Sequence, residues 1–101
     1  MDLDVRHDER AHKFYAVIDG REAHVVYRPV GDGVYDFRHT YVPPELRGQH
    51  VAEELVRGAL DETRRLGRRF IATCPFVKAF VERHPEYREG ESTHGPRSEA
   101  R

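Results

Sequence analysis

The chain has 101 residues, with 17 basic and 18 acidic side chains and a formal net charge of −1. That length suits a single domain with one core. The near-neutral balance argues against nucleic acid or an anionic membrane as a partner, and no apolar run approaches the roughly 20 residues of a membrane-spanning helix. The single cysteine cannot form an intramolecular disulfide. We therefore expect one soluble, cytoplasmic domain.

The first part of the chain predicts an antiparallel β-meander. Residues 13–18 are rich in β-forming side chains, and an Asp-Gly pair follows as a hairpin signal. Residues 22–28 form the next strand candidate, and a second glycine-rich turn leads into residues 34–42. A short strand near residues 3–6 is only weakly indicated. These strands should pair in chain order.

The second part of the chain changes to helical periodicity. Apolar residues recur every three to four positions between residues 45 and 67, which predicts an amphipathic helix. Residues 69–73 are a short strand candidate, and a second helix begins at Cys74 and closes at His84. Because a helical crossover joins the last strand to the third long one, those two strands should be parallel. The predicted fold class is α+β, an antiparallel meander followed by helix, strand and helix.

The domain organisation follows from the same pattern. Residues 1–88 form one predicted domain, without internal repeats. Residues 89–101 are polar and contain Gly, Ser and Pro, which is typical of a loose C-terminal tail.

The turn before the first helix is a candidate anion site. Two prolines end the preceding strand, and Gly48 gives the backbone room to approach a ligand. Backbone N–H groups at a helix start lack intrahelical partners, and the helix dipole favours negative charge. Arg47 can also reach a phosphate. The pattern predicts a phosphate-bearing ligand, although an ordinary helix start has the same features.

Cys74 is a candidate catalytic residue. It precedes Pro75, and proline favours the first helical position, so Cys74 should be the N-cap of the second helix. A helix N-terminus favours the thiolate, which would make Cys74 a candidate nucleophile. The alternative is a small buried hydrophobic residue that ends a core strand.

His39 is the second catalytic candidate. Strand alternation would place it on one face with Tyr35, Phe37 and Tyr41. Its imidazole could serve as a general base, or it could be a structural histidine among aromatic residues. The seven histidines show no metal-ligand spacing, so we expect no metal site.

Four ordered motifs resemble the GNAT acetyltransferase superfamily. Residues 42–55 resemble its motif A, Arg/Gln-x-x-Gly-x-Gly/Ala, at the same strand-to-helix junction. The remaining motifs resemble those of a small NATD1-type subfamily. They are His39-Thr40-x-Val42, Cys74 at the next helix, and His84-Pro85-x-Tyr87 at its end. The resemblance covers roughly residues 5–88.

The resemblance implies acetyl-CoA as the cofactor. It would place the pyrophosphate on the backbone amides of Gln49, His50, Val51 and Ala52, and the pantetheine arm beside Tyr41 and Val42. His50 stands where the motif normally has glycine. Larger members use a tyrosine on the last helix as an acid. Its nearest equivalents here are Phe80, which lacks a hydroxyl, and Tyr87.

The activity implied is acetyl transfer to an amine, directly or through Cys74. The acceptor would be a protein or a small molecule, and the enzyme a monomer or a weak dimer. The alternative is a CoA-binding module with little or no transferase activity.

Overall fold

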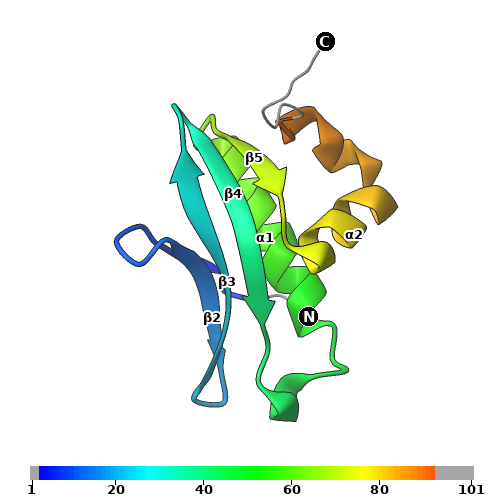
Figure 1. The fold of residues 1–101 in the computed structure, drawn as a ribbon. Coiled ribbons are helices and arrows are strands. Elements are labelled where there is room, and N and C mark those ends of the chain that lie inside the picture. Colours follow the sequence, from blue (N-terminus) through cyan, green and yellow to red (C-terminus); the bar gives the residue numbers. More distant parts are fainter. Residues whose placement is uncertain (1–2, 93–101) are drawn as a thin grey trace.

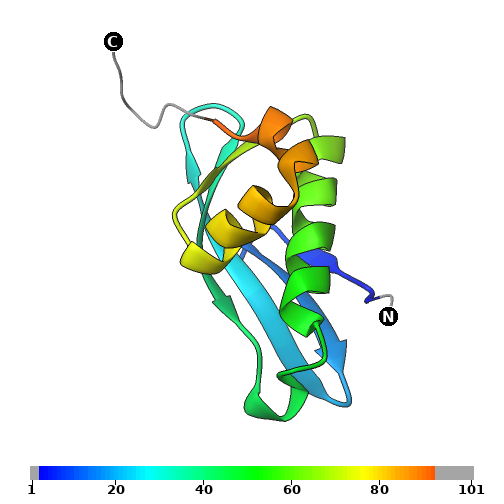
Figure 2. The same cartoon turned by 90° about the vertical axis from the view of Figure 1, so that its right-hand side faces the viewer.

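The computed structural model describes residues 3–92, which form a five-stranded sheet with both helices on one face (Figures 1 and 2). The strands lie side by side in chain order: β1 (Arg6–Asp8), β2 (Lys13–Ile18), β3 (Arg21–Val30), β4 (Val34–Tyr41) and β5 (Arg69–Ala72). Neighbours from β1 to β4 are antiparallel, and β4 and β5 are parallel. The predicted α+β class and its parallel pair are confirmed. The weakly indicated first strand begins later than expected, at Arg6.

The two helices are α1 (Val51–Arg65) and α2 (Pro75–Arg83). Short 3₁₀ turns precede and follow them, η1 (Pro44–Leu46) and η2 (Pro85–Gly90). The predicted start of the first helix at residue 45 is wrong. After η1 the backbone becomes extended at Arg47 and left-handed at Gly48 and His50, with φ of 84° and 61°. The α-helix therefore cannot begin before Val51.

The core fills the space between the sheet and the helices. Phe14, Val25 and Phe37 come from three adjacent strands, and Leu55 and Phe80 come from α1 and α2. All five side chains are fully buried. They form one continuous apolar cluster, so the sheet and both helices share a single core.

A β-bulge interrupts β4 at Arg38. Tyr27 of β3 pairs with Phe37, but the preceding residue, Val26, pairs with His39. Arg38 is therefore the extra residue in the ladder. An extra residue reverses the face to which every later side chain in the strand points.

The bulge decides which residues at the end of β4 face the helices. Thr40 pairs with the fully buried Val25 and lies on the helix side of the sheet. His39 and Tyr41 lie on the opposite, open face and are exposed. The prediction that they share a face with the buried aromatic residues earlier in the strand is wrong, because alternation does not anticipate the bulge.

The chain remains paired beyond the predicted domain boundary at residue 88. Glu91 forms a parallel bridge with Phe70 of β5, and the Ser92 N–H donates to the Phe70 carbonyl at 2.6 Å. Of the expected tail at 89–101, residues 93–101 lie outside the described residues.

Gly58 allows the N-terminal segment to cross α1. A Cβ atom at this position would lie 2.6 Å from Cγ2 and 2.8 Å from Cβ of Val5. In a helix interior, alanine is ordinarily more stable than glycine by about 0.5–1 kcal/mol. Here we expect Gly58→Ala to lower the free energy of unfolding by about 1–2 kcal/mol, because crowding a packed site outweighs helix propensity. Urea unfolding measures the change.

The matched control for this prediction removes the Val5 side chain. In a Val5→Gly background, Gly58→Ala should become stabilising, because only helix propensity remains. If Gly58→Ala destabilises both backgrounds equally, Val5 is not the cause.

His7 makes the stability depend on pH. Its ring stacks on Phe14 with centroids 4.2 Å apart, and its Nε2 shares a 2.6 Å hydrogen bond with the Tyr27 hydroxyl. Burial lowers the pKa of His7 below its ordinary value of 6.5. The unfolded chain therefore takes up this proton first as the pH falls. His7 should contribute its full stabilisation above pH 6.5 and lose it progressively below.

Urea unfolding at pH 7.5 and pH 5.5 tests this dependence. The wild type should lose more stability between the two pH values than a His7→Gln variant. Equal losses would show that His7 does not couple protonation to folding.

Candidate functional site

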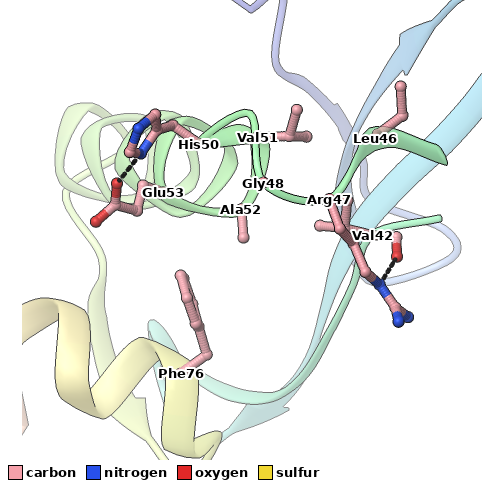
Figure 3. Close-up of a pocket in the computed structure, with 9 residues that line it drawn as sticks. All are labelled: Val42, Leu46, Arg47, Gly48, His50, Val51, Ala52, Glu53 and Phe76. Carbon is pink, nitrogen blue, oxygen red and sulfur yellow. Dashed lines mark hydrogen bonds and ion pairs between the residues drawn. The ribbon is translucent and has the colours of Figure 1, made fainter. Parts of the chain in front are cut away.

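A cavity of about 300 Å³ opens where β4 ends and α1 begins. Its lining is mainly apolar (Figure 3) and consists of Val42, Leu46, Arg47, Gly48, His50, Val51, Ala52, Glu53 and Phe76. Phe76 belongs to the first turn of α2, so both helix starts contribute to the cavity. Six of the eight cofactor-binding residues predicted from sequence line it; Tyr41 and Gln49 do not.

The backbone of the turn leaves N–H groups free at the start of α1. Gly48 and His50 have φ of 84° and 61°, and His50 is the N-cap, with no side-chain hydrogen bond to cap the helix. The first helical bond joins the Glu54 N–H to the His50 carbonyl at 3.1 Å. The N–H groups of the three residues between them therefore have no acceptor in the helix.

His50 adopts the left-handed conformation that glycine adopts without cost. Its ψ is 21°, and this region costs a non-glycine residue roughly 1–2 kcal/mol. The motif's preference for glycine at this position therefore has a physical basis, and the histidine here bears that cost.

The Arg47 side chain forms a hydrogen bond within the turn. Its Nε donates to the Val42 carbonyl at 2.8 Å, and Figure 3 shows the guanidinium beside that carbonyl rather than beside His50. The side chain thus ties the end of β4 to the turn. A carbonyl oxygen has two lone pairs, so Val42 retains one acceptor position.

Glu53 brings a carboxylate to the cavity, which sequence analysis missed. One carboxylate oxygen accepts a 2.9 Å hydrogen bond from Nδ1 of His50 (Figure 3). The other accepts a hydrogen bond from Arg83, also at 2.9 Å. The hydrogen bond from His50 is the main cause that holds the pKa of Glu53 below its usual value. The spacing of His50 and Glu53, three residues apart near a helix start, was the available signal.

Cys74 lies where β4 and β5 separate. The last pair of the parallel ladder is Phe37 with Ala72, and the Cys74 N–H then donates to the Phe37 carbonyl at 2.8 Å. The predicted N-cap position of Cys74 is confirmed. Its side chain is 3 % exposed, and its Sγ lies 3.4 Å from Oγ1 of Thr40. Sequence analysis missed Thr40 because the bulge turns it inward.

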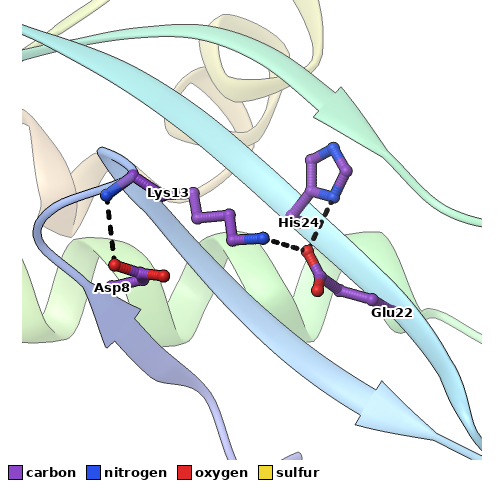
Figure 4. A network of polar contacts seen from close by, with 5 residues as sticks. Asp8, Lys13, Glu22 and His24 are labelled. Carbon is purple, nitrogen blue, oxygen red and sulfur yellow. Dashed lines mark hydrogen bonds and ion pairs between the residues drawn. The ribbon is translucent and has the colours of Figure 1, made fainter.

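The structure does not bring His39 and Cys74 together. His39 lies on the open face of the sheet, whereas the Cys74 sulfur lies on the helix side with Thr40. The open face also carries a polar network, in which Glu22 accepts hydrogen bonds from Lys13 at 2.6 Å and from His24 at 3.1 Å (Figure 4). The hydrogen bond from Lys13 is the main cause that lowers the pKa of Glu22.

Neither residue considered as the acid lies at the cavity. Phe80 is fully buried in the core. The Tyr87 hydroxyl donates to Asp61 of α1 at 2.8 Å, and burial raises its pKa. Asp61 is ten residues beyond Val51 on the helix, roughly 15 Å along its axis. The Tyr87 hydroxyl therefore makes a structural contact that lies away from the cavity.

Residues 3–92 contain neither a membrane-spanning helix nor a metal-binding cluster. Within this range no helix is long and apolar enough to cross a membrane. No group of three or more His, Cys, Asp or Glu side chains is placed to hold a metal ion in the same part of the chain.

The fold and the cavity at the strand-to-helix turn define the class of the protein. The sequence pattern of the GCN5-related N-acetyl-transferase family matches residues 13–90, and the chain belongs to this family. Its members generally bind acetyl-CoA and act on an acceptor.

The chain is also similar to individual proteins of known sequence or structure. The chain is 34% identical over 83 residues to protein NATD1 of Bos taurus, covering 80% of this chain and 74% of that protein. It is 32% identical over 91 residues to protein NATD1 of Danio rerio, covering 86% and 83% respectively. The solution NMR structure of a GCN5-like protein from Staphylococcus aureus matches with a TM-score of 0.67 and 27% identity, covering 96% of this chain and 98% of that one.

Proposed function

We propose that this protein binds acetyl-CoA in the cavity at the start of α1 and transfers the acetyl group to an amine. The observation that carries the proposal is the uncapped helix N-terminus beside a mainly apolar cavity. Free N–H groups and the helix dipole suit a pyrophosphate, and apolar walls suit a pantetheine arm. Acetyl-CoA would supply an activated acyl group.

Each part of the turn has a role in this proposal. The backbone N–H groups from Gln49 to Ala52 hold the pyrophosphate, and the backbone near Tyr41 and Val42 pairs with the pantetheine arm. Gly48 allows the close approach of backbone and phosphate. Arg47 fixes the turn through the Val42 carbonyl.

Direct transfer is the route that the geometry favours over a covalent route through Cys74. The thiol is 3 % exposed and belongs to the apolar core cluster, so it is poorly placed to attack and then release an acyl group. His39 lies on the open face, where it can take a proton from an amine that arrives from that side.

Calorimetry, intact mass and an amine panel test the proposal together. We expect one acetyl-CoA to bind per chain and at least one amine to be acetylated, with transfer retained by Cys74→Ser. Absence of binding would refute the proposal. Binding without transfer to any amine would favour a CoA-binding module, and an acetylated Cys74 would restore the covalent route.

Glu53 should weaken the cofactor site because its carboxylate lies near the expected phosphates. Glu53→Gln removes that charge and frees His50 and Arg83. We expect acetyl-CoA affinity to rise roughly 2- to 5-fold, the range typical of a charge near a helix terminus, with a smaller gain at high salt. Calorimetry of both proteins at two salt concentrations measures the effect.

Glu54→Gln is the matched control. Glu54 also lies in the first turn of α1 but does not line this cavity. It should change the affinity less than Glu53→Gln does. Equal gains would indicate a general charge effect rather than a contact at the cavity.

A further inference from the structure

The open face of the sheet carries arginine side chains at the point where β4 and β5 separate. Neither helix covers this face (Figure 2). Phe37 and Ala72 form the last pair of the parallel ladder, and Arg38 follows that pair directly on β4. In the proposed function the acceptor amine arrives from the open face and passes this point. The inference below names the class of that acceptor, so it rests on the proposed function.

The bulge brings Arg38 to the open face. Asp36 faces this side of the sheet, because its neighbours Tyr35 and Phe37 both lie in the core. The Arg38 guanidinium lies 3.4 Å from a carboxylate oxygen of Asp36, so it shares that face. His39 also lies there. Two successive residues of β4 therefore point to the same side, which regular strand alternation does not allow.

The Asp36 carboxylate does not neutralise the arginines around it. One of its oxygens accepts a 2.5 Å hydrogen bond from the Thr73 hydroxyl, which follows β5. The contact with Arg38 is longer than the roughly 2.7–2.9 Å of a close ion pair, and 46 % of the Arg38 side chain remains exposed. Arg28 pairs with Asp36 across the β3–β4 ladder. It is exposed and forms no ion pair within residues 3–92.

The resulting excess of positive charge is local. The whole chain has a formal net charge of −1, so it does not attract acidic partners in general. On the β1–β2 side of the same face, Lys13 is paired with Glu22 at 2.6 Å and Arg6 with Asp4 at 3.0 Å. A positive surface that no helix covers is complementary to a negatively charged partner.

We propose that Arg38 and Arg28 bind carboxylate side chains of the acceptor, and that the acceptor is an extended segment of an acidic polypeptide. Its amine would lie beside His39, with aspartate or glutamate side chains next to it in the sequence. An uncovered sheet face suits a peptide, because an extended chain can cross neighbouring strands and contact both arginines. Polyamines and lysine-rich segments are disfavoured, because the two guanidinium groups repel them.

Peptide binding tests this surface without cofactor or turnover. Fluorescence anisotropy would compare three labelled peptides of equal length, in which aspartates, asparagines or lysines flank a central lysine. We expect the wild type to bind the aspartate peptide about tenfold more tightly than the asparagine peptide, the gain from two exposed ion pairs. The preference should shrink at high salt. Equal affinity for all three peptides would overturn the proposal.

Substitutions locate the preference on the sheet. Arg38→Gln and Arg28→Gln should each reduce it roughly threefold, and Arg38→Glu should reverse it in favour of the lysine peptide. Arg6→Glu is the matched control, because Arg6 is an exposed arginine on β1 at the far side of the same sheet. It should leave the preference nearly unchanged. Equal changes in Arg6→Glu and Arg38→Glu would indicate a general charge effect and overturn the proposal.

Turnover separates the acceptor class from the proposed function. With acetyl-CoA, the aspartate peptide should show a KM about tenfold lower than the asparagine peptide at a similar kcat, because the arginines bind the peptide away from the reacting nitrogen. Equal kcat/KM for all peptides would overturn the acceptor class and leave the proposed function standing. Failure of acetyl-CoA to bind would refute the proposed function, whereas the anisotropy measurement still decides whether the surface binds acidic peptides.

Competition with free aspartate distinguishes a peptide from an amino acid. We expect free aspartate to displace the labelled aspartate peptide only at much higher concentration than the unlabelled peptide does, because one amino acid cannot reach both arginines with side-chain carboxylates. Displacement at equal concentrations would show that an amino acid is sufficient and would contradict the proposed peptide acceptor.

Discussion

Replacing Gly48 with valine should weaken acetyl-CoA binding by roughly 5- to 150-fold. Gly48 has φ of 84°, a region in which a β-branched residue is a genuine outlier. Valine would hold the turn in another conformation, and binding would have to restore the present one. That restoration costs about 1–3 kcal/mol, which corresponds to the stated loss.

Gly31→Val is the matched control for this prediction. Gly31 also has a positive φ, 55°, and a Cβ there would meet no atom within 4 Å. It precedes the start of β4, whereas Gly48 follows its end. Gly31→Val should lower stability without changing the affinity for acetyl-CoA. Calorimetry that shows equal affinity losses in both variants would contradict a specific role for the turn.

Phe80→Ala should produce the largest loss of stability. The ring is fully buried and lies with its centroid 4.3 Å from that of His84 and 5.6 Å from that of Tyr87. The Arg57 guanidinium lies 5.5 Å above it. Removing such a ring costs about 3–5 kcal/mol, a large share of the 5–15 kcal/mol that is typical of a domain.

Urea unfolding of Phe80→Ala and Phe76→Ala tests this assignment. Phe76 is only half-buried and lines the cavity, so its removal should destabilise much less. A loss below about 1.5 kcal/mol for Phe80→Ala would be too small for a packed core ring. That result would contradict the packing of α2 described above.

The sheet and helices could be predicted because their periodicities are strong. Alternation over residues 13–18 and a helical stripe after residue 51 each have one clear interpretation. The start of α1 could not be placed, because left-handed backbone at His50 leaves no trace in hydrophobic periodicity. The bulge at Arg38 could not be predicted either, because one extra residue does not visibly change the composition of the strand.

The same distinction applies to the candidate site. The turn from Arg47 to Ala52 was predictable, because its motif and its helix start are contiguous in sequence. The contribution of Phe76 to the cavity and the contact of Thr40 with Cys74 were not predictable, because both depend on tertiary structure. Thr40 depends on the bulge, and Phe76 depends on the parallel pairing of β5 that brings α2 beside α1.

An NMR titration with acetyl-CoA tests the central claim most directly. We expect the backbone amide resonances from Gly48 to Ala52 to shift most and those of Val42 and Phe76 to shift with them. The resonance of Gly31, near the other end of β4, should not shift. No shift at saturating acetyl-CoA, or the largest shifts on the open face around Glu22 and His24, would contradict it.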